Sequence, residues 1–256
     1  MSHNNIKSYQ DTGSGLPIVL IHAFPTDQQL WEPQRQGLQR HFRIITLDLH
    51  GFGKSSPADG QAIPMSEYAF DVMHLLDQLQ IEKAIIGGES MGGYIALAFL
   101  EKYPKRVSGL ILSDTQSIPD TSEAKSKRET TAIDVLQNGT STLIDGFIPK
   151  TLSAQAPDAT RQSLKKILEA QSPLAITSAL RGMALRTDTS HILAATQLPI
   201  LIITGEQDIM VSPDQSEAMH TLAKNSKLVK IADAGHLPSF EKPEEWNAAV
   251  VDFFKH

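Results

Sequence analysis

The sequence predicts an α/β protein whose mostly parallel central sheet is flanked by helices and interrupted once by an all-helical insertion. Three observations carry this prediction. Short apolar runs recur along the chain, stretches with helical spacing lie between them, and one long polar stretch contains no such run. Strands buried on both faces have nearly continuous apolar sequences, and strand–helix alternation favours a parallel sheet.

The predicted strands are short and rich in Ile, Leu and Val. In chain order they cover residues 18–21, 44–49, 84–86, 110–112, 200–203 and 228–231. The predicted helices between them cover residues 29–40, 66–79, 91–103, 213–224 and 243–254. Right-handed crossover connections are expected to join these strands.

The alternation stops near residue 116 and resumes near residue 192. Within this stretch, Ser172-Pro173 has the residue types of a helix N-cap and first helical position, and Asn138-Gly139 those of a helix end. A structureless connection of about 75 residues is improbable in a compact domain. We therefore expect a core of residues 1–115 and 192–256, with a helical cap subdomain over residues 116–191.

Composition narrows the function classes. The 256 residues carry a net charge of −6 with acidic and basic residues interspersed, so no basic patch favours a nucleic-acid partner. The chain has no cysteine, which excludes disulfides, thiolate metal sites and a cysteine nucleophile. No secretory signal is recognisable at the N-terminus, and no apolar run approaches the roughly 18–20 residues of a membrane span. We expect a cytoplasmic protein without a membrane partner.

Ser90 is the candidate nucleophile. It lies in Gly88-Glu89-Ser90-Met91-Gly92, between a predicted strand and a predicted helix. A G-x-S-x-G in this position is typical of a nucleophile elbow, because a Cβ two residues before or after the serine would collide with neighbouring backbone. A serine hydroxyl also needs a base, an orienting carboxylate and donors for the oxyanion. The alternative is a glycine-rich turn with a bystander serine.

The loops after the later strands supply candidates for the base and the acid. His236 follows the last predicted strand, and ligands bind beyond the carboxyl ends of strands in such sheets. Asp208 and Asp114 each follow a predicted strand, and either carboxylate would be placed to reach the histidine. Asp208 is preferred, with Asp114 as its rival. Glu89, beside the nucleophile, is interpreted as secondary or structural.

These motifs resemble the α/β-hydrolase fold superfamily. Within it, the sequence is similar to the esterase and lactonase group that includes 3-oxoadipate enol-lactonases. The segments that carry the resemblance are Ile21-His22-Ala23-Phe24-Pro25, Trp31-Glu32-Pro33-Gln34, Leu47-Asp48-Leu49-His50-Gly51-Phe52-Gly53-Lys54-Ser55, Gly88-Glu89-Ser90-Met91-Gly92-Gly93-Tyr94, Gly205-Glu206-Gln207-Asp208 and Gly235-His236. They span nearly the whole chain outside the insertion. Two departures are Ala23, where the family often has Gly, and Glu89, where it often has His or an uncharged residue.

The resemblance implies a role for each site residue. Ser90 is the nucleophile, Asp208 the acid and His236 the base, while the backbone N–H groups of Phe24 and Met91 form the oxyanion hole. It also implies that the helical insertion is a cap over the site. The apolar side chains of this cap are expected to form a pocket for a small or medium acyl group.

The function expected is a serine hydrolase that cleaves a carboxylic ester or lactone through an acyl-enzyme on Ser90. It needs no cofactor and no metal, and its partner is a small-molecule substrate. Carbon–carbon bond hydrolysis or cofactor-free perhydrolysis at the same triad is the first alternative, and a non-catalytic ligand receptor that retains the triad is the second. Gly51-Phe52-Gly53-Lys54-Ser55 mimics a phosphate-binding loop, but Asp48 stands where that loop needs glycine.

Overall fold

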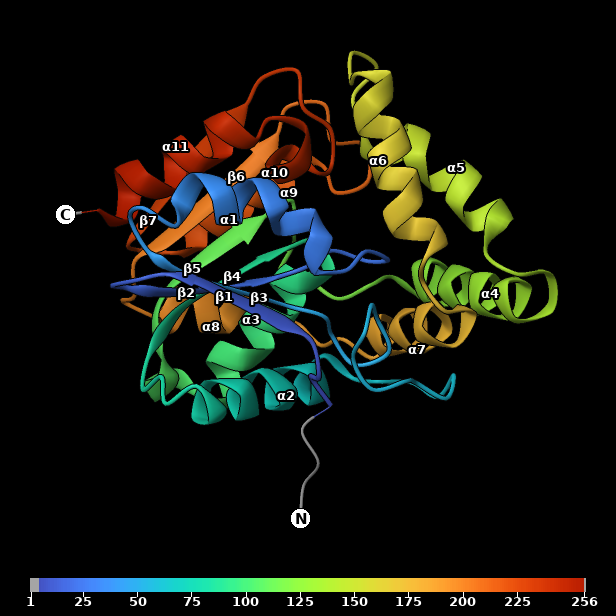
Figure 1. Cartoon of the computed structure of the whole chain (residues 1–256), viewed down its shortest axis with the longest axis horizontal. Helices are drawn as coiled ribbons and strands as arrows, with labels where there is room; N and C mark the ends of the chain where they lie inside the picture. Colours follow the sequence, from blue (N-terminus) through green and yellow to red (C-terminus); the bar gives the residue numbers. More distant parts are fainter. Residues whose placement is uncertain (1–4, 256) are drawn as a thin grey trace.

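A seven-stranded sheet forms the centre of the computed structural model, which describes residues 5–255 (Figure 1). The strand order is β1-β3-β2-β4-β5-β6-β7. β1 runs antiparallel to β3, and every other neighbouring pair is parallel. The strands are β1 (Tyr9–Gly13), β2 (Pro17–Ile21), β3 (Arg43–Leu47), β4 (Ala84–Glu89), β5 (Val107–Ser113), β6 (Ile200–Gly205) and β7 (Ser226–Ile231). The predicted α/β class and parallel sheet are therefore confirmed.

Helices cover both faces of the sheet, so the central strands are buried; every residue of β4 and β6 is inaccessible to solvent or nearly so. One face carries α1 (Glu32–Leu38), α10 (Pro238–Glu241) and α11 (Pro243–Phe254). The other carries α2 (Met65–Gln78), α3 (Met91–Lys102), α8 (Ser190–Ala195) and α9 (Pro213–Leu222). Two 3₁₀ helices, η1 (Gln28–Trp31) and η2 (Pro104–Arg106), complete this part.

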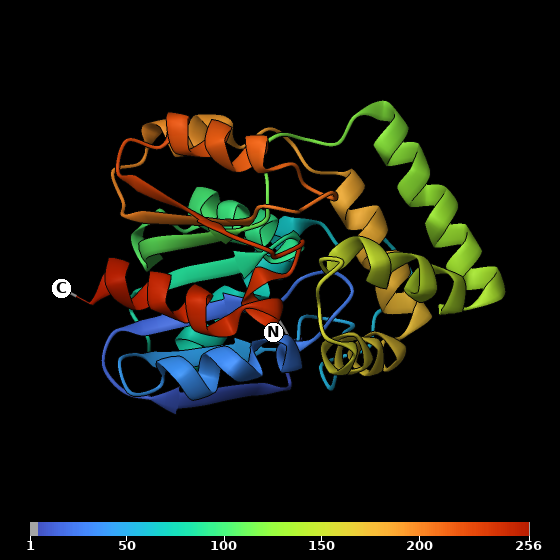
Figure 2. The same cartoon turned by 90° about the horizontal axis from the view of Figure 1, so that it is seen from above.

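Four helices lie together beyond the carboxyl ends of the strands (Figure 2). They are α4 (Ser122–Asn138), α5 (Ser141–Thr151), α6 (Asp158–Glu169) and α7 (Pro173–Ala184). Gly139, at φ 81°, ends α4, and the Ser172 side chain accepts a hydrogen bond from Leu174 N at the start of α7, as the sequence predicts. The chain rejoins the core at α8, beside α3 and α9. None of the helices in residues 5–255 has the length and apolar character needed to cross a membrane.

The edge strand and the first predicted helix differ from the sequence prediction, and the short helix α10 was not predicted. The edge strand β1 has the polar sequence YQDTG and is half-exposed, so it lacks the apolar run that reveals a buried strand. The helix predicted over residues 29–40 divides into η1 and a shorter α1 that begins at Glu32-Pro33. Proline fits the first turn of a helix because it has no N–H to donate, and it therefore favours a new helix start at this point.

Candidate active site

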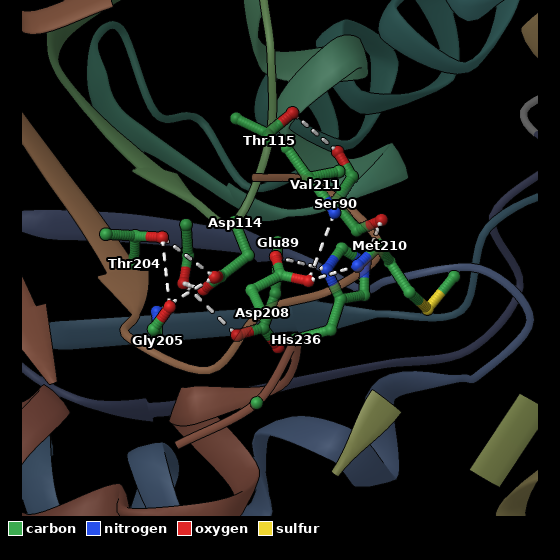
Figure 3. Close-up of polar contacts among 12 residues, drawn as sticks. Glu89, Ser90, Asp114, Thr115, Thr204, Gly205, Asp208, Met210, Val211 and His236 are labelled. Atoms are coloured by element: carbon green, nitrogen blue, oxygen red, sulfur yellow. Dashed lines mark hydrogen bonds and ion pairs between the residues drawn. The ribbon is translucent and has the colours of Figure 1, made fainter. Parts of the chain in front are cut away.

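Ser90 occupies the sharp turn between β4 and α3, with φ 55° and ψ −113°. A positive φ is strained for a residue with a side chain. Two hydrogen bonds hold the turn: Ser90 N donates to the Ser113 carbonyl (2.8 Å), and Thr115 Oγ1 donates to the Ser90 carbonyl (2.8 Å) (Figure 3). A Cβ on Gly88 would lie 2.1 Å from the Gly92 backbone, and one on Gly92 would lie 2.1 Å from the Ile21 carbonyl oxygen. Both positions therefore require glycine.

His236 contacts both Ser90 and Asp208 (Figure 3). Its Nε2 lies 2.8 Å from Ser90 Oγ, and its Nδ1 lies 2.7 Å from Asp208 Oδ2. The other Asp208 oxygen accepts from Met210 N (2.8 Å) and Val211 N (3.1 Å). Burial opposes ionisation of Asp208, but His236 and these two N–H groups outweigh it and lower the pKa of the Asp208 carboxyl. The structure thus brings three of the sequence-predicted residues into one hydrogen-bonded line.

Asp114, the rival acid, is buried next to Asp208 but is held by other partners. Its Oδ1 accepts from Gly205 N (2.9 Å) and Thr204 Oγ1 (3.2 Å). Burial, together with the negative charges of Asp208 and Glu89, raises the pKa of the Asp114 carboxyl well above its usual value. Asp114 is therefore the carboxyl group that holds a proton more readily, and the hydrogen bond to His236 belongs to Asp208.

A metal ion would find three potential ligands here, because one donor atom each of Asp114, Asp208 and His236 lies within 4.8 Å of the others. Both imidazole nitrogens of His236 are already hydrogen-bonded, to Asp208 and to Ser90. A cation would have to displace Asp208 from the imidazole. His236 and Asp208 are therefore engaged in hydrogen bonds that a metal ion would have to break.

Glu89 is fully buried, and its carboxylate bonds to α10. It accepts from Ser239 Oγ (2.6 Å), Ser239 N (3.3 Å) and Ser113 Oγ (3.1 Å). Burial raises the pKa of Glu89 to about 7, although the Ser239 hydrogen bonds favour the charged form. Glu89 therefore ties the turn at Ser90 to the segment that follows His236.

The two expected oxyanion donors lie in different loops. Met91 is the first residue of α3, where N–H groups have no acceptor within the helix, and no side chain caps this end. Within residues 5–255, the Phe24 N–H donates to no backbone carbonyl. Phe24 lies in the loop after β2 and is buried. Among the described residues, neither N–H group has a backbone acceptor.

His22 shapes the Phe24 loop, a role that its sequence position alone does not reveal. Burial lowers the pKa of His22, which favours the neutral imidazole. Its Nδ1 donates to the Ala23 carbonyl (3.0 Å), and its Nε2 accepts from Leu49 N (3.2 Å). Thr26 Oγ1 donates to the same Ala23 carbonyl (2.8 Å). These bonds hold the Ala23 carbonyl from His22 and Thr26 and tie His22 to Leu49, and so they support the loop that leads to Phe24.

The inserted helices contact the loops of the site directly. The Phe147 ring of α5 meets the Phe24 ring edge-on, with centroids 6.2 Å apart. Gln171, which follows α6, donates to Asp27 Oδ2 (2.9 Å) and accepts from Gly53 N (3.1 Å). Sequence reasoning identifies the insertion but not these contacts, because they join residues more than a hundred positions apart.

The fold and this site define a class of protein. The chain belongs to the alpha/beta hydrolase fold family, whose model matches residues 17–243. It is 32% identical over 260 residues to the AB hydrolase superfamily protein YisY of Bacillus subtilis, covering 95% of this chain and 93% of that protein. It is 27% identical to 3-oxoadipate enol-lactonase 1 of Acinetobacter baylyi, covering 93% of this chain and 88% of that protein.

A solved structure is similar throughout. The thermophilic esterase from Thermogutta terrifontis, determined with malate bound, superimposes with a TM-score of 0.94 at 36% identity. The match covers 97% of this chain and 92% of that chain. These relatives confirm the predicted resemblance to esterases and lactonases of the α/β-hydrolase fold.

Proposed function

We propose that this protein is a serine hydrolase that cleaves a carboxylic ester or a lactone through an acyl-enzyme on Ser90. The observation that carries the proposal is the position of His236, 2.8 Å from Ser90 Oγ and 2.7 Å from Asp208 Oδ2. This is the geometry that a serine nucleophile, a general base and an orienting carboxylate require. Relatives named as an esterase and an enol-lactonase support the same reaction class.

In the first half of the reaction, Ser90 Oγ attacks the carbonyl carbon while His236 Nε2 takes its proton. The carbonyl oxygen becomes an oxyanion and accepts hydrogen bonds from the N–H groups of Phe24 and Met91. Asp208 stays ionised and stabilises the imidazolium that forms. The lowered pKa of Asp208 is consistent with this role.

In the second half, the bond to the leaving alcohol breaks and His236 returns the proton to the alcohol oxygen. A lactone keeps that alcohol tethered to the acyl group on Ser90. Water then attacks the acyl-enzyme, His236 takes the water proton and passes it to Ser90 Oγ, and the carboxylic acid leaves. The acyl-enzyme cycle uses only groups of this chain and water.

We assign the helices between residues 116 and 191 to a cap that covers the site and shapes the acyl pocket. Support comes from the ring of Phe147 in α5, which meets the ring of Phe24 in the proposed oxyanion loop. Aromatic and aliphatic walls with few polar groups favour apolar acyl groups of small or medium size. A series of p-nitrophenyl esters of increasing acyl length, beside a set of lactones, measures that preference.

Replacing the nucleophile tests the proposed function. Ser90→Ala should lower turnover of p-nitrophenyl esters by about 10⁴- to 10⁶-fold. Ser126→Ala is the matched control, because Ser126 is exposed on α4, and it should keep wild-type activity. Near wild-type turnover by Ser90→Ala contradicts the proposal. Peroxide-dependent halide oxidation without ester turnover would instead support a perhydrolase, and phosphonylation of Ser90 without any turnover would support a receptor.

A further inference from the structure

The Glu241 carboxylate joins the inserted helices to the loop that carries His236. Glu241 is the last residue of α10. Its Oε2 accepts from Gly235 N (3.0 Å), the residue before His236, and from Ser153 N (3.1 Å), in the turn after α5. Its Oε1 accepts from the Ser153 hydroxyl. A single carboxylate therefore bonds the histidine loop and the turn after α5 at the same time.

The turn after α5 also contacts the His236 backbone itself. His236 N donates to the Thr151 carbonyl (2.8 Å). Thr151 ends α5, and the last carbonyl groups of a helix have no N–H donor within the helix. A Cβ on Gly235 would lie 2.8 Å from both Ser153 N and the Thr151 oxygen. The two backbones are thus packed so closely that only glycine fits at position 235.

The turn is anchored on its other side to α6. Arg161 Nη2 donates to the Ser153 carbonyl (2.6 Å). Ser153 and Thr151 are buried, whereas Glu241 is half-buried. Segment 151–153 therefore forms a fixed surface between α5 and α6, and the histidine loop rests on it.

We propose that Glu241 is a positioning residue that docks segment 151–153 onto the histidine loop, so that the cap holds the base His236 in its reactive geometry. This inference rests on the proposed function, because it assigns His236 as the base. The reaction needs Nε2 to stay within hydrogen-bond distance of Ser90 Oγ, and a displacement of about 1 Å can cost about 10²-fold in rate. The cap then contributes to the chemical step as well as to the shape of the acyl pocket.

Three variants and one control test the proposal. Glu241→Ala removes the acceptor and leaves the Gly235 and Ser153 N–H groups unpaired. Glu241→Gln keeps one acceptor oxygen for these N–H groups, and its amide can donate to the Ser153 hydroxyl. Ser153→Ala removes only the hydroxyl donor. Glu245→Ala is the matched control, because Glu245 is an exposed carboxylate of α11.

Each variant is assayed for kcat and KM with p-nitrophenyl butyrate and for the rate of Ser90 labelling by a fluorophosphonate. Glu241→Ala should lower kcat and the labelling rate by about 30- to 100-fold with little change in KM, as expected for a misplaced base. Ser153→Ala should lower kcat by about 3- to 10-fold, because one of the Glu241 hydrogen bonds is lost. Glu241→Gln should stay within about 3-fold of wild type, and Glu245→Ala should match wild type.

Several outcomes overturn the proposal. Glu241→Ala with a native melting temperature and wild-type kcat does so, and so does a loss confined to KM, which would mean that Glu241 shapes the pocket alone. If Glu241→Ala does not fold, Ser153→Ala decides, and wild-type kcat for that variant overturns the proposal. Failure of the proposed function looks different: the wild-type protein itself is then neither labelled on Ser90 nor able to hydrolyse the ester.

Discussion

Asp114 and Asp208 lie side by side at the carboxyl ends of neighbouring strands, yet only Asp208 hydrogen-bonds His236. Two buried carboxylates at this separation do not both ionise, because each charge disfavours the other. Asp208 faces the imidazole and two N–H groups, which lower its pKa. Asp114 lies deeper, where burial and the neighbouring carboxylates raise its pKa. The pair therefore shares one negative charge, and that charge sits on Asp208.

Replacing each aspartate with asparagine should change kcat by very different amounts. Asp208→Asn removes the charge that orients and stabilises the imidazolium, so kcat should fall by about 10³- to 10⁴-fold. Asp114→Asn replaces a protonated carboxyl with a neutral amide of the same shape, so kcat should stay within about 5-fold of wild type, as for a volume-conserving change. Steady-state assays of both variants decide between them. A large loss in Asp114→Asn with activity retained in Asp208→Asn would reverse the assignment of the acid.

The raised pKa of Glu89 is expected to make the free energy of unfolding depend on pH. An unfolded glutamate titrates near 4.5, whereas the pKa of native Glu89 is about 7. Between these pH values the native state binds more protons than the unfolded state, so the free energy of unfolding falls as pH rises from about 4.5 to about 7. Glu89→Gln abolishes this contribution, which amounts to about 3 kcal/mol. Urea unfolding of both proteins at pH 5 and pH 8 measures it, and parallel pH dependences would contradict the prediction.

Alanine substitutions at an elbow glycine and at a glycine of α5 should have opposite effects on stability. Gly88→Ala places a Cβ 2.1 Å from backbone and should destabilise the protein by about 3 kcal/mol or more. Gly146→Ala, within α5, meets no atom within 4 Å and should stabilise by roughly 0.5–1 kcal/mol because alanine favours helix. Urea unfolding midpoints compare the two. Equal midpoints would show that the elbow tolerates a side chain at position 88.

Asp120, just before the inserted helices, forms ion pairs that are expected to stabilise the folded protein. The Asp120 carboxylate accepts from both Arg128 and Arg186, and the Arg186 guanidinium lies 3.5 Å from the centroid of the Tyr94 ring in α3. Asp120→Ala leaves two guanidinium groups without their shared anion, which should destabilise by about 3 kcal/mol. Glu129→Ala, which removes the exposed partner of Arg181, should change stability by less than about 1 kcal/mol.

The pH dependence of the Asp120 effect checks its origin. Burial opposes ionisation of Asp120, but Arg128 and Arg186 outweigh it and lower the pKa of its carboxyl. Stability from a lowered acid pKa is present above the unfolded value near 3.8 and is lost as pH falls through the native value. The difference between wild type and Asp120→Ala should therefore be full at pH 7 and shrink below about pH 4. A difference that is the same at pH 7 and pH 3 would rule out an ion-pair origin.

The buried strands and the elbow could be predicted from sequence because their physical constraints act on neighbouring residues. β4 is an apolar run because helices cover both of its faces, and Gly88 and Gly92 are glycine because backbone passes within 2.1 Å of each missing Cβ. The edge strand β1 escaped prediction because exposure on one edge allows polar residues such as Gln10 and Asp11.

The choice of Asp208 as the proposed acid and the contacts of the inserted helices could not be predicted from the sequence. Asp114 and Asp208 follow adjacent strands, and the sequence alone does not show which carboxylate turns toward His236. The hydrogen bond from His236 N to the Thr151 carbonyl joins two backbone groups, so it does not depend on which side chains the residues carry. Ser153 and Glu241 are 88 residues apart, and no local pattern pairs them.

Mass spectrometry of the protein after fluorophosphonate treatment shows whether Ser90 is the nucleophile. Wild type should gain the mass of a single label, located on the peptide that contains Ser90, and should lose ester hydrolysis in step with labelling. Ser90→Ala should gain no label. A label on another residue, or ester hydrolysis that persists after Ser90 is fully labelled, would contradict the assignment.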